Sequence, residues 1–263
     1  MKGKIMKLFI ILDNGIYHPR FLYDFLRQTE DEVVGAAIIT RIPDKNNIEK
    51  YFQKHFFYLN LQEIVKLFLR KISLIMGNIL CNLLNKPSIY SVKAIIKLFK
   101  IPYIEINDNI NNRCYLDYIQ QSQPDIIISS NPLIFGKELL SIPRYGCINR
   151  HSALLPRYGG VLPVFQAVKN REKNTGVTIH IMEEKIDTGA ILEQIPVPIK
   201  KEDTLDTLYK KCFSQSVIAL LAAIKKIKSD NGNYVKNRDK PSYFSWPAKK
   251  DWELFRLNGG KVI

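Results

Sequence analysis

Short apolar runs that alternate with an amphipathic segment constrain the fold of this chain most strongly. Residues 7–12 and 33–40 are apolar runs of the kind found in buried parallel strands. Between them, residues 19–28 place their apolar side chains at helical spacing. A strand, a helix and a strand in this order predict the first unit of an α/β fold with parallel strands.

The rest of the chain extends this pattern. Further strands are expected at residues 102–106, 125–130, 146–150, 176–182 and 190–195. Residues 116–121 predict a short helix, and residues 204–226 predict a long one that packs on the sheet. The connection from residue 41 to 101 is too long for a loop, so we expect one or two helices there. Together these elements predict a mostly parallel sheet with flanking helices.

Residues 56–84 form the longest apolar region. Charged residues interrupt it at Glu63, Lys66, Arg70 and Lys71, so it lacks the roughly 18 uncharged apolar residues typical of a membrane-spanning helix. We expect an amphipathic helix that covers the sheet, with a helix lying on a membrane surface as the alternative.

The bulk properties limit the class of protein without choosing it. The 263 residues suit one large domain, here residues 1–228, with a short C-terminal extension, residues 229–263. The net charge of +14 suits nucleic acid, anionic lipid or a phosphorylated substrate, and equally a solvated Lys-rich surface. The four Cys form no C-x-x-C pair and no secretion signal is visible, so we expect reduced thiols, no metal site and a cytoplasmic protein.

The residues most suited to chemistry lie between positions 146 and 189. Asn149 and His151 stand two apart at the end of a predicted strand, so both side chains point to one face. The carboxyl ends of parallel strands are where ligands bind in open α/β folds. An amide N–H can stabilise an oxyanion and an imidazole can move a proton, which together suit acyl transfer. Asp187, after a later strand, can orient the imidazole, although each residue alone also fits a structural role.

The segments INRHSALLPRYGGVLPVFQAV and TGVTIHIMEEKIDTGAIL, in this order and at this spacing, resemble the 10-formyltetrahydrofolate-dependent formyltransferases. That family includes glycinamide ribonucleotide, methionyl-tRNA and sugar N-formyltransferases. The resemblance is good over residues 100–195 and implies a Rossmann-like fold, with 10-formyltetrahydrofolate as formyl donor. It also implies that an amine attacks the formyl carbon while Asn149 and protonated His151 stabilise the oxyanion. Asp187 would help to accept the amine proton, and His151 as the base is the alternative.

The resemblance further implies a folate slot between two loops. The residues predicted to bind folate are Asn131, Leu133, Ile134, Phe135, Met182, Glu183 and Ile186. An ordinary apolar core is the alternative for residues 133–135. The LLPRYGG turn is predicted to bind the acceptor through Arg157, Tyr158, Gly159 and Gly160. Arg157 suits a phosphate, with a solvated surface position as the alternative.

The chain departs from the family pattern directly after His151. The family often places a Ser two residues after the His, whereas here Ser152 follows it directly and Ala153 holds the usual position. A hydrogen bond from that Ser is therefore in question. His180 is expected to be a structural or pocket residue rather than a catalytic one.

The extension decides the expected acceptor. Few residues follow position 228 for the tRNA-binding barrel of methionyl-tRNA formyltransferases, so nucleic acid is not the expected partner. A catalytic domain with a short tail resembles the sugar N-formyltransferases of surface-polysaccharide synthesis, which implies a nucleotide-linked amino sugar as acceptor. Tyr243, Phe244, Trp246 and Trp252 suit nucleobase stacking, packing on the domain, or a homodimer contact. Three alternatives stay open: a methionyl-tRNA formyltransferase without the barrel, a formyltetrahydrofolate hydrolase, and a non-enzymatic basic protein that binds nucleic acid or membrane.

Overall fold

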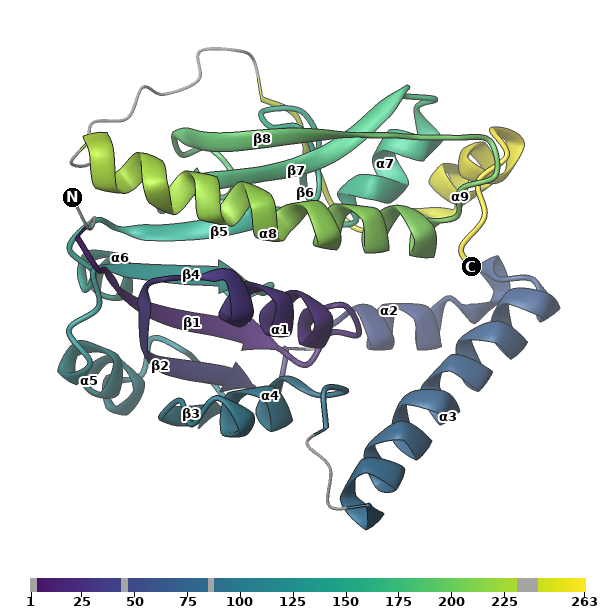
Figure 1. Ribbon diagram of the computed structural model, residues 1–263. Helices are drawn as coiled ribbons and strands as arrows, with labels where there is room; N and C mark the ends of the chain where they lie inside the picture. Colours follow the sequence, from purple (N-terminus) through teal and green to yellow (C-terminus); the bar gives the residue numbers. More distant parts are fainter. Residues whose placement is uncertain (1–3, 44–46, 85–87, 231–240) are drawn as a thin grey trace.

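A seven-stranded sheet with helices on both faces forms the centre of the molecule (Figure 1). The computed structural model describes residues 4–43, 47–84, 88–230 and 241–263. The sheet order is β3-β2-β1-β4-β5-β7-β8. The strands are β1 (Lys7–Asp13), β2 (Glu32–Ile39), β3 (Tyr103–Ile106), β4 (Ile126–Ser130), β5 (Cys147–His151), β7 (Asn174–Ile181) and β8 (Ile191–Pro198).

The first five strands of this order are parallel, and β7 and β8 are antiparallel to their neighbours. The prediction of a mostly parallel α/β sheet is therefore confirmed. The chain runs outward from β1 to β3 and then returns to β4 on the other side of β1. Such a reversal opens a crevice at the carboxyl ends of the central strands, and β5 ends beside it.

The two faces of the sheet bury separate apolar cores because neighbouring residues of a strand point to opposite sides. Leu8, Ile10 and Leu12 of β1 enter the larger core, and Phe9 and Ile11 enter the smaller one. The helices on the larger core are α1 (His18–Gln28), α2 (Ile48–Lys54), α4 (Val92–Leu98), α7 (Pro163–Lys169), α8 (Leu205–Asp230) and α9 (Lys249–Leu257). The smaller core is covered by α5 (Arg113–Gln121) and α6 (Lys137–Ser141).

The connection between β2 and β3 differs from the expectation in two ways. Its described part holds three α-helices rather than one or two: α2 (Ile48–Lys54), α3 (Leu61–Leu83) and α4. The expectation that the apolar helix covers the sheet is wrong, because α3 stands away from the sheet at one side of the molecule (Figure 1). Its apolar side chains are largely exposed, Phe68 to 63% and Leu69 to 57%. None of the described helices combines the length and the apolar composition that crossing a bilayer requires.

The C-terminal residues fold back onto the larger core. The two-residue strand β9 (Tyr243–Phe244) pairs with β6 (Gly159–Gly160), and α9 contributes Trp252, whose ring centroid lies 4.8 Å from that of Phe165. Helix α8 continues to Asp230, past the predicted boundary at residue 228. The beginning of the predicted extension, residues 231–240, lies outside the described residues. The described part of the extension packs on the domain, and the division at residue 228 and the homodimer contact stay predictions.

Trp252 should be central to the attachment of this extension. Its side chain is only 2% exposed, so Trp252→Ala removes a large ring from a filled core. We expect a loss of about 3–5 kcal/mol in the free energy of unfolding, measured by urea titration. Leu257→Ala on the same helix is the control, because that side chain is 77% exposed and should change stability little. Equal stability of the two variants would contradict this packing.

Candidate active site

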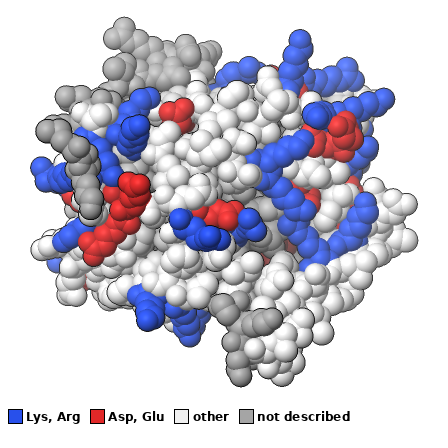
Figure 2. Space-filling view, viewed as in Figure 1, with Lys and Arg blue, Asp and Glu red and all other residues white. Residues whose placement is uncertain are grey.

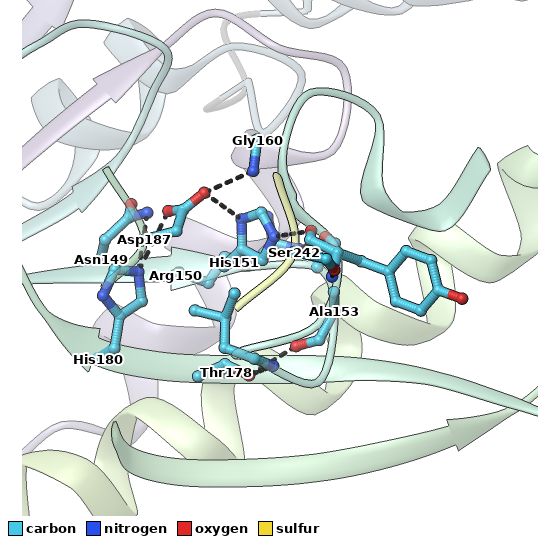
Figure 3. A network of polar contacts seen from close by, with 12 residues as sticks. Asn149, Arg150, His151, Ala153, Gly160, Thr178, His180, Asp187 and Ser242 are labelled. Atoms are coloured by element: carbon cyan, nitrogen blue, oxygen red, sulfur yellow. Dashed lines mark hydrogen bonds and ion pairs between the residues drawn. The ribbon is translucent and has the colours of Figure 1, made fainter. Parts of the chain in front are cut away.

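The end of β5 brings the two residues of the Asn-x-His pair to one face of the sheet edge. In the antiparallel pairing with β7, Asn149 lies opposite His180, and His151 lies opposite Thr178. Figure 3 shows Asn149, His151 and His180 around the carboxylate of Asp187. The structure thus brings together the three predicted catalytic side chains and adds His180 to them.

One ring nitrogen of His151 is held by a backbone hydrogen bond, and the other faces Asp187. Its Nε2 lies 2.8 Å from the carbonyl oxygen of Tyr158, which only accepts hydrogen bonds, so Nε2 carries the hydrogen. Its Nδ1 faces Asp187 Oδ2 at 3.8 Å. Burial lowers the pKa of His151 below its ordinary value, and the nearby Asp187 charge opposes this only in part. The resting imidazole is therefore neutral, with an unprotonated Nδ1 toward the carboxylate.

Asp187 is held as a carboxylate. Its Oδ2 accepts a 2.7 Å hydrogen bond from the backbone N–H of Gly160, and its Oδ1 lies 3.6 Å from His180 Nε2. Burial alone would raise the pKa of Asp187, but His151, which is positive when protonated, the facing His180 ring and the Gly160 N–H outweigh it and hold the pKa well below its usual range. The residue also adopts a left-handed φ of 55°, a costly conformation that clusters at functional sites.

His180 lies between the amide of Asn149 and the carboxylate of Asp187. Its Nδ1 lies 2.9 Å from the carbonyl oxygen of Ile181, so this nitrogen donates and Nε2 is left as an acceptor. Asn149 Nδ2 lies 3.4 Å from that Nε2. One amide hydrogen of Asn149 is thereby oriented by His180, and the second stays available for a ligand. Whether His180 is a structural or a pocket residue stays a prediction.

The turn after β5 supplies both backbone contacts to this cluster, and the C-terminal extension holds the turn. Ser242 Oγ accepts a 2.9 Å hydrogen bond from the Tyr158 N–H, and Gly159 N donates to Ser242 O at 2.9 Å. Gly160 has a φ of 90°, and a Cβ there would meet the Phe244 carbonyl oxygen at 2.2 Å. Only glycine allows this approach. Sequence reasoning missed Ser242, because its contact with Tyr158 spans 84 positions and leaves no local signal.

The departure from the family pattern has a structural counterpart. The hydroxyl of Ser152 accepts a hydrogen bond from the Arg150 guanidinium, on the side of α8 rather than toward Asp187. At the next position the Ala153 carbonyl oxygen accepts a 2.6 Å hydrogen bond from Thr178 Oγ1. Thr178 Oγ1 also accepts from the Leu155 N–H at 3.1 Å. Thr178 therefore holds the turn, and no Ser is needed two residues after His151 to do so.

The residues predicted to bind folate lie on two loops beside β5. Leu133 and Met182 are half-buried against the smaller core, to which Phe135 belongs with 3% exposure. Ile134 and Ile186 are exposed to 55% and 45%. Asn131 holds its own loop, with Nδ2 donating to Ser129 Oγ at 2.9 Å and Oδ1 accepting from the Leu133 N–H at 2.9 Å. Glu183 lies half-buried on the loop before Asp187. These positions stay predictions as binding residues.

The residues predicted to bind the acceptor lie in two places. Gly159 and Gly160 form β6 and contact the extension and Asp187. Arg157 forms an ion pair with Glu172, which also accepts a 2.6 Å hydrogen bond from the Tyr158 hydroxyl. Arg157 and Tyr158 line a hollow of about 420 Å³. Its other lining residues are Ala153, Leu154, Arg171, Glu172, Lys173, Asn174 and Thr175.

Comparison with known proteins gives the class. The formyl transferase family matches residues 85–224, more than half of the chain. The chain therefore belongs to the formyltransferase family. The bifunctional polymyxin resistance protein ArnA of Wigglesworthia glossinidia brevipalpis is 36% identical over 196 residues, which are 74% of this chain and 30% of that protein. A methionyl-tRNA formyltransferase of Thermotoga maritima is 36% identical over 53% of this chain and 45% of that protein. The chain thus spans about half or less of the length of these curated relatives.

Solved structures share the fold. A sugar N-formyltransferase from a Shewanella species matches with a TM-score of 0.58 and 18% identity, over 97% of this chain and 88% of that chain. A phosphoribosylglycinamide formyltransferase from Bacillus halodurans matches with a TM-score of 0.55 and 22% identity, over 85% of this chain and 96% of that chain. At these identities the likeness establishes the formyltransferase fold and no particular substrate.

Proposed function

We propose that this protein transfers the formyl group of 10-formyltetrahydrofolate to the amine of a nucleotide-linked amino sugar, for surface-polysaccharide synthesis. The observation that carries the proposal is the cluster of Asn149, His151 and Asp187 at the end of β5, in a chain of the formyltransferase family. An amide donor, a neutral imidazole and a permanent carboxylate around one point match the needs of amine formylation.

The loops beside β5 fit the folate donor. A folate ring needs an apolar slot with a few polar groups to orient it. Leu133 and Met182 offer partly covered apolar surface, and Ile134 and Ile186 add exposed apolar side chains from the same two loops. We assign the pterin ring to these four residues. When bound, the donor supplies the formyl carbon as the electrophile.

Three side chains of the protein transfer the proton and stabilise the charges of the reaction. The Asp187 carboxylate attracts the ammonium form of the acceptor and holds it beside His151 Nδ1. That nitrogen accepts the proton that leaves the ammonium, which frees the amine to attack, and later returns it to the leaving nitrogen. The further proton that the attack leaves on the new amide nitrogen passes to solvent beside the Asp187 carboxylate. The free amide hydrogen of Asn149 stabilises the negative charge that develops on the formyl oxygen. His151 suits the role of base better than Asp187. Its lowered pKa keeps the imidazole unprotonated near neutral pH, whereas the pKa of Asp187 is so low that its carboxylate accepts a proton poorly.

This assignment predicts the direction of the pH dependence. If neutral His151 is the base, kcat/KM falls as the pH drops through the pKa of His151, which lies below its ordinary value of 6.5. Asp187 causes no change in kcat/KM between pH 5 and 8, because its pKa lies far below that range. We expect one acidic limb with a midpoint below about 6.5 and a plateau near neutral pH. The alternative, in which protonated His151 is required, predicts activity that falls with rising pH over the same window.

The surroundings of the turn support a nucleotide-linked acceptor. Tyr243 is 59% exposed, and its ring lies about 3.0 Å from where a Gly160 Cβ would stand, close to the backbone group that holds Asp187. An exposed aromatic ring beside a reaction centre suits base stacking. Arg157, Arg171 and Lys173 line the hollow beside the same turn, and such donors suit a pyrophosphate.

A methionyl-tRNA acceptor is the second candidate. The curated relatives named methionyl-tRNA formyltransferase and the net charge of +14 favour it. A deformylase is a third reading of the same fold, because a formyltetrahydrofolate deformylase of Pseudomonas syringae matches with a TM-score of 0.56 and 13% identity, over 86% of this chain and 62% of that chain.

An acceptor panel separates these readings. The purified protein is given 10-formyltetrahydrofolate with amino-sugar nucleotides, with glycinamide ribonucleotide, or with charged initiator tRNA, and the formylated product is measured. We expect product with at least one amino-sugar nucleotide and little with the other two. Formylation of tRNA alone would replace the sugar assignment. Formate release that does not depend on an amine would support the deformylase reading instead.

A further inference from the structure

Arg150 is a cation buried in the larger core directly behind Asn149 and His151. It stands between these two residues on β5, and because side chains alternate along a strand it points to the opposite face of the sheet. Figure 2 shows Lys and Arg side chains standing out over the visible surface of the protein, which is the usual place for a cation. Arg150, by contrast, is only 8% exposed. Burial lowers the pKa of Arg150 to about 10, so the guanidinium is still charged at neutral pH.

Among the described residues, three contacts hold the guanidinium, and none of them is with a carboxylate. Its Nε donates to Ser216 Oγ on α8 at 2.9 Å, and its Nη2 donates to Ser152 Oγ. The guanidinium carbon lies 3.7 Å from the ring centroid of Phe213, also on α8. The carboxylate whose charge acts on the guanidinium is that of Asp13, at the end of β1, but the ion pair of Asp13 is with another residue.

A cation in such surroundings is costly for the fold. A charge taken out of water loses hydration energy that two hydroxyl groups and an aromatic ring replace only in part. Replacing buried ionic groups by well-packed apolar side chains of similar volume is often neutral or stabilising in proteins. Stability alone therefore does not account for Arg150, and its position indicates a role at the site that β5 carries.

The end of β5 needs support that the sheet gives only in part. The parallel pairing of β5 with β4 ends at Asn149, and its antiparallel pairing with β7 ends at His151. The backbone of His151 is therefore attached to the sheet along one edge alone, and Ser152 lies beyond both pairings. Arg150 donates to Ser152 on the far side of His151 and to Ser216 on α8. The residues on both sides of His151 are thereby tied to one helix.

We propose that Arg150 is a positioning residue for formyl transfer, which holds His151 where its Nδ1 faces the Asp187 carboxylate at 3.8 Å. This inference rests on the proposed role of His151 as the base. It also gives the hydroxyl directly after His151 a function, because Ser152 is the acceptor for Arg150. The guanidinium charge has a second effect, since it opposes a positive charge on His151. Asp187 and His180 are the other charged or titratable groups that act on this imidazole.

Arg150→Met tests this proposal, because it leaves a long side chain in the core and removes the charge and the donors. We expect a thermal midpoint within a few degrees of the wild type or above it, a kcat about tenfold lower, and little change in KM for donor and acceptor. The acidic limb of kcat/KM should move to higher pH, because a positive charge that opposes protonation of His151 is gone. The matched control is Arg20→Met, at an Arg side chain exposed to 75% on α1, and it should behave like the wild type in every one of these measurements.

Two further variants separate the contact from the charge. Ser152→Ala keeps the charge and removes the acceptor beside His151, so kcat should fall severalfold while the acidic limb keeps its wild-type midpoint. Arg150→Lys keeps the charge and loses the planar fork of donors, so it should restore the midpoint and only part of kcat. These two variants also carry the test if Arg150→Met does not fold.

A lower thermal midpoint in Arg150→Met with wild-type kcat and pH profile would overturn the proposal, because Arg150 would then only fill the core. Wild-type kcat in both Ser152→Ala and Arg150→Lys would do the same. The protonation of His151 is also followed by NMR without donor or acceptor, with its signal assigned by its loss in His151→Asn. Its midpoint should rise in Arg150→Met even if the acceptor panel gives no product, and an unchanged midpoint would contradict the effect of the charge. The inference and the proposed function can therefore fail separately.

Discussion

Asp187→Asn is expected to lower kcat/KM for formyl transfer by about a thousandfold, within the range of lost general acid–base and electrostatic catalysis. The substitution keeps the shape of the side chain and an oxygen that can still accept the Gly160 N–H. It removes the negative charge that faces His151 Nδ1 at 3.8 Å and that would hold the acceptor ammonium. The measurement is initial-rate kinetics at neutral pH with whichever acceptor the panel identifies.

Asp117→Asn is the matched control, because that side chain is 45% exposed on α5 and far from the site in sequence and sheet order. It should leave kcat/KM unchanged. Thermal unfolding of both variants should show that each is folded. A folded Asp187→Asn variant could retain more than a tenth of the wild-type activity. That result would show that formyl transfer does not need the carboxylate charge.

Asn149→Ala is the second substitution with a large expected effect. The amide is the side-chain donor of the cluster that can meet a developing oxyanion, and removing one such donor costs about 10²- to 10³-fold in kcat. Because the donor acts mainly in the transition state, kcat should fall while KM changes little. The substitution also leaves His180 Nε2 without the 3.4 Å contact, so the thermal midpoint should fall by a few degrees at most.

Asn112→Ala serves as the control for this variant. Asn112 precedes α5, and its amide donates to Asp108 at the surface. Both variants lose one amide, and only the one at β5 should lose activity. A parallel rise of KM with unchanged kcat in Asn149→Ala would instead assign Asn149 to uniform binding of donor or acceptor.

The sheet was predictable because its central strands, such as β1 and β4, are buried on both faces and must be apolar nearly throughout. The outer strand β8 is buried at alternate positions over part of its length and was predicted from alternation. The seven predicted runs coincide with β1, β2, β3, β4, β5, β7 and β8 to within a few residues. The position of Asn149 and His151 at a strand end follows from the same pattern. The closeness of Asp187 depended on the family resemblance, because 36 positions separate it from His151 and its left-handed backbone has no signature in sequence.

Two features were beyond sequence reasoning for physical reasons. Periodicity locates a helix such as α3 and its apolar face but does not say which face meets the protein, and here the ion pairs of Glu63 and Arg70 decide it. The contact between β9 and the turn after β5 is made through backbone groups, Ser242 and the stacked rings of Tyr158 and Phe244, and none of these contacts has a local signal in the sequence. Both depend on groups far apart in the chain.

The most direct test of the central claim follows a labelled formyl group from 10-formyltetrahydrofolate into an amino-sugar nucleotide, with wild type and Asp187→Asn in the same assay. The proposed site predicts labelled N-formyl sugar from the wild type, at a rate about a thousandfold above that of the variant. Label released as formate regardless of the amine, or transfer at equal rates by both proteins, would contradict it.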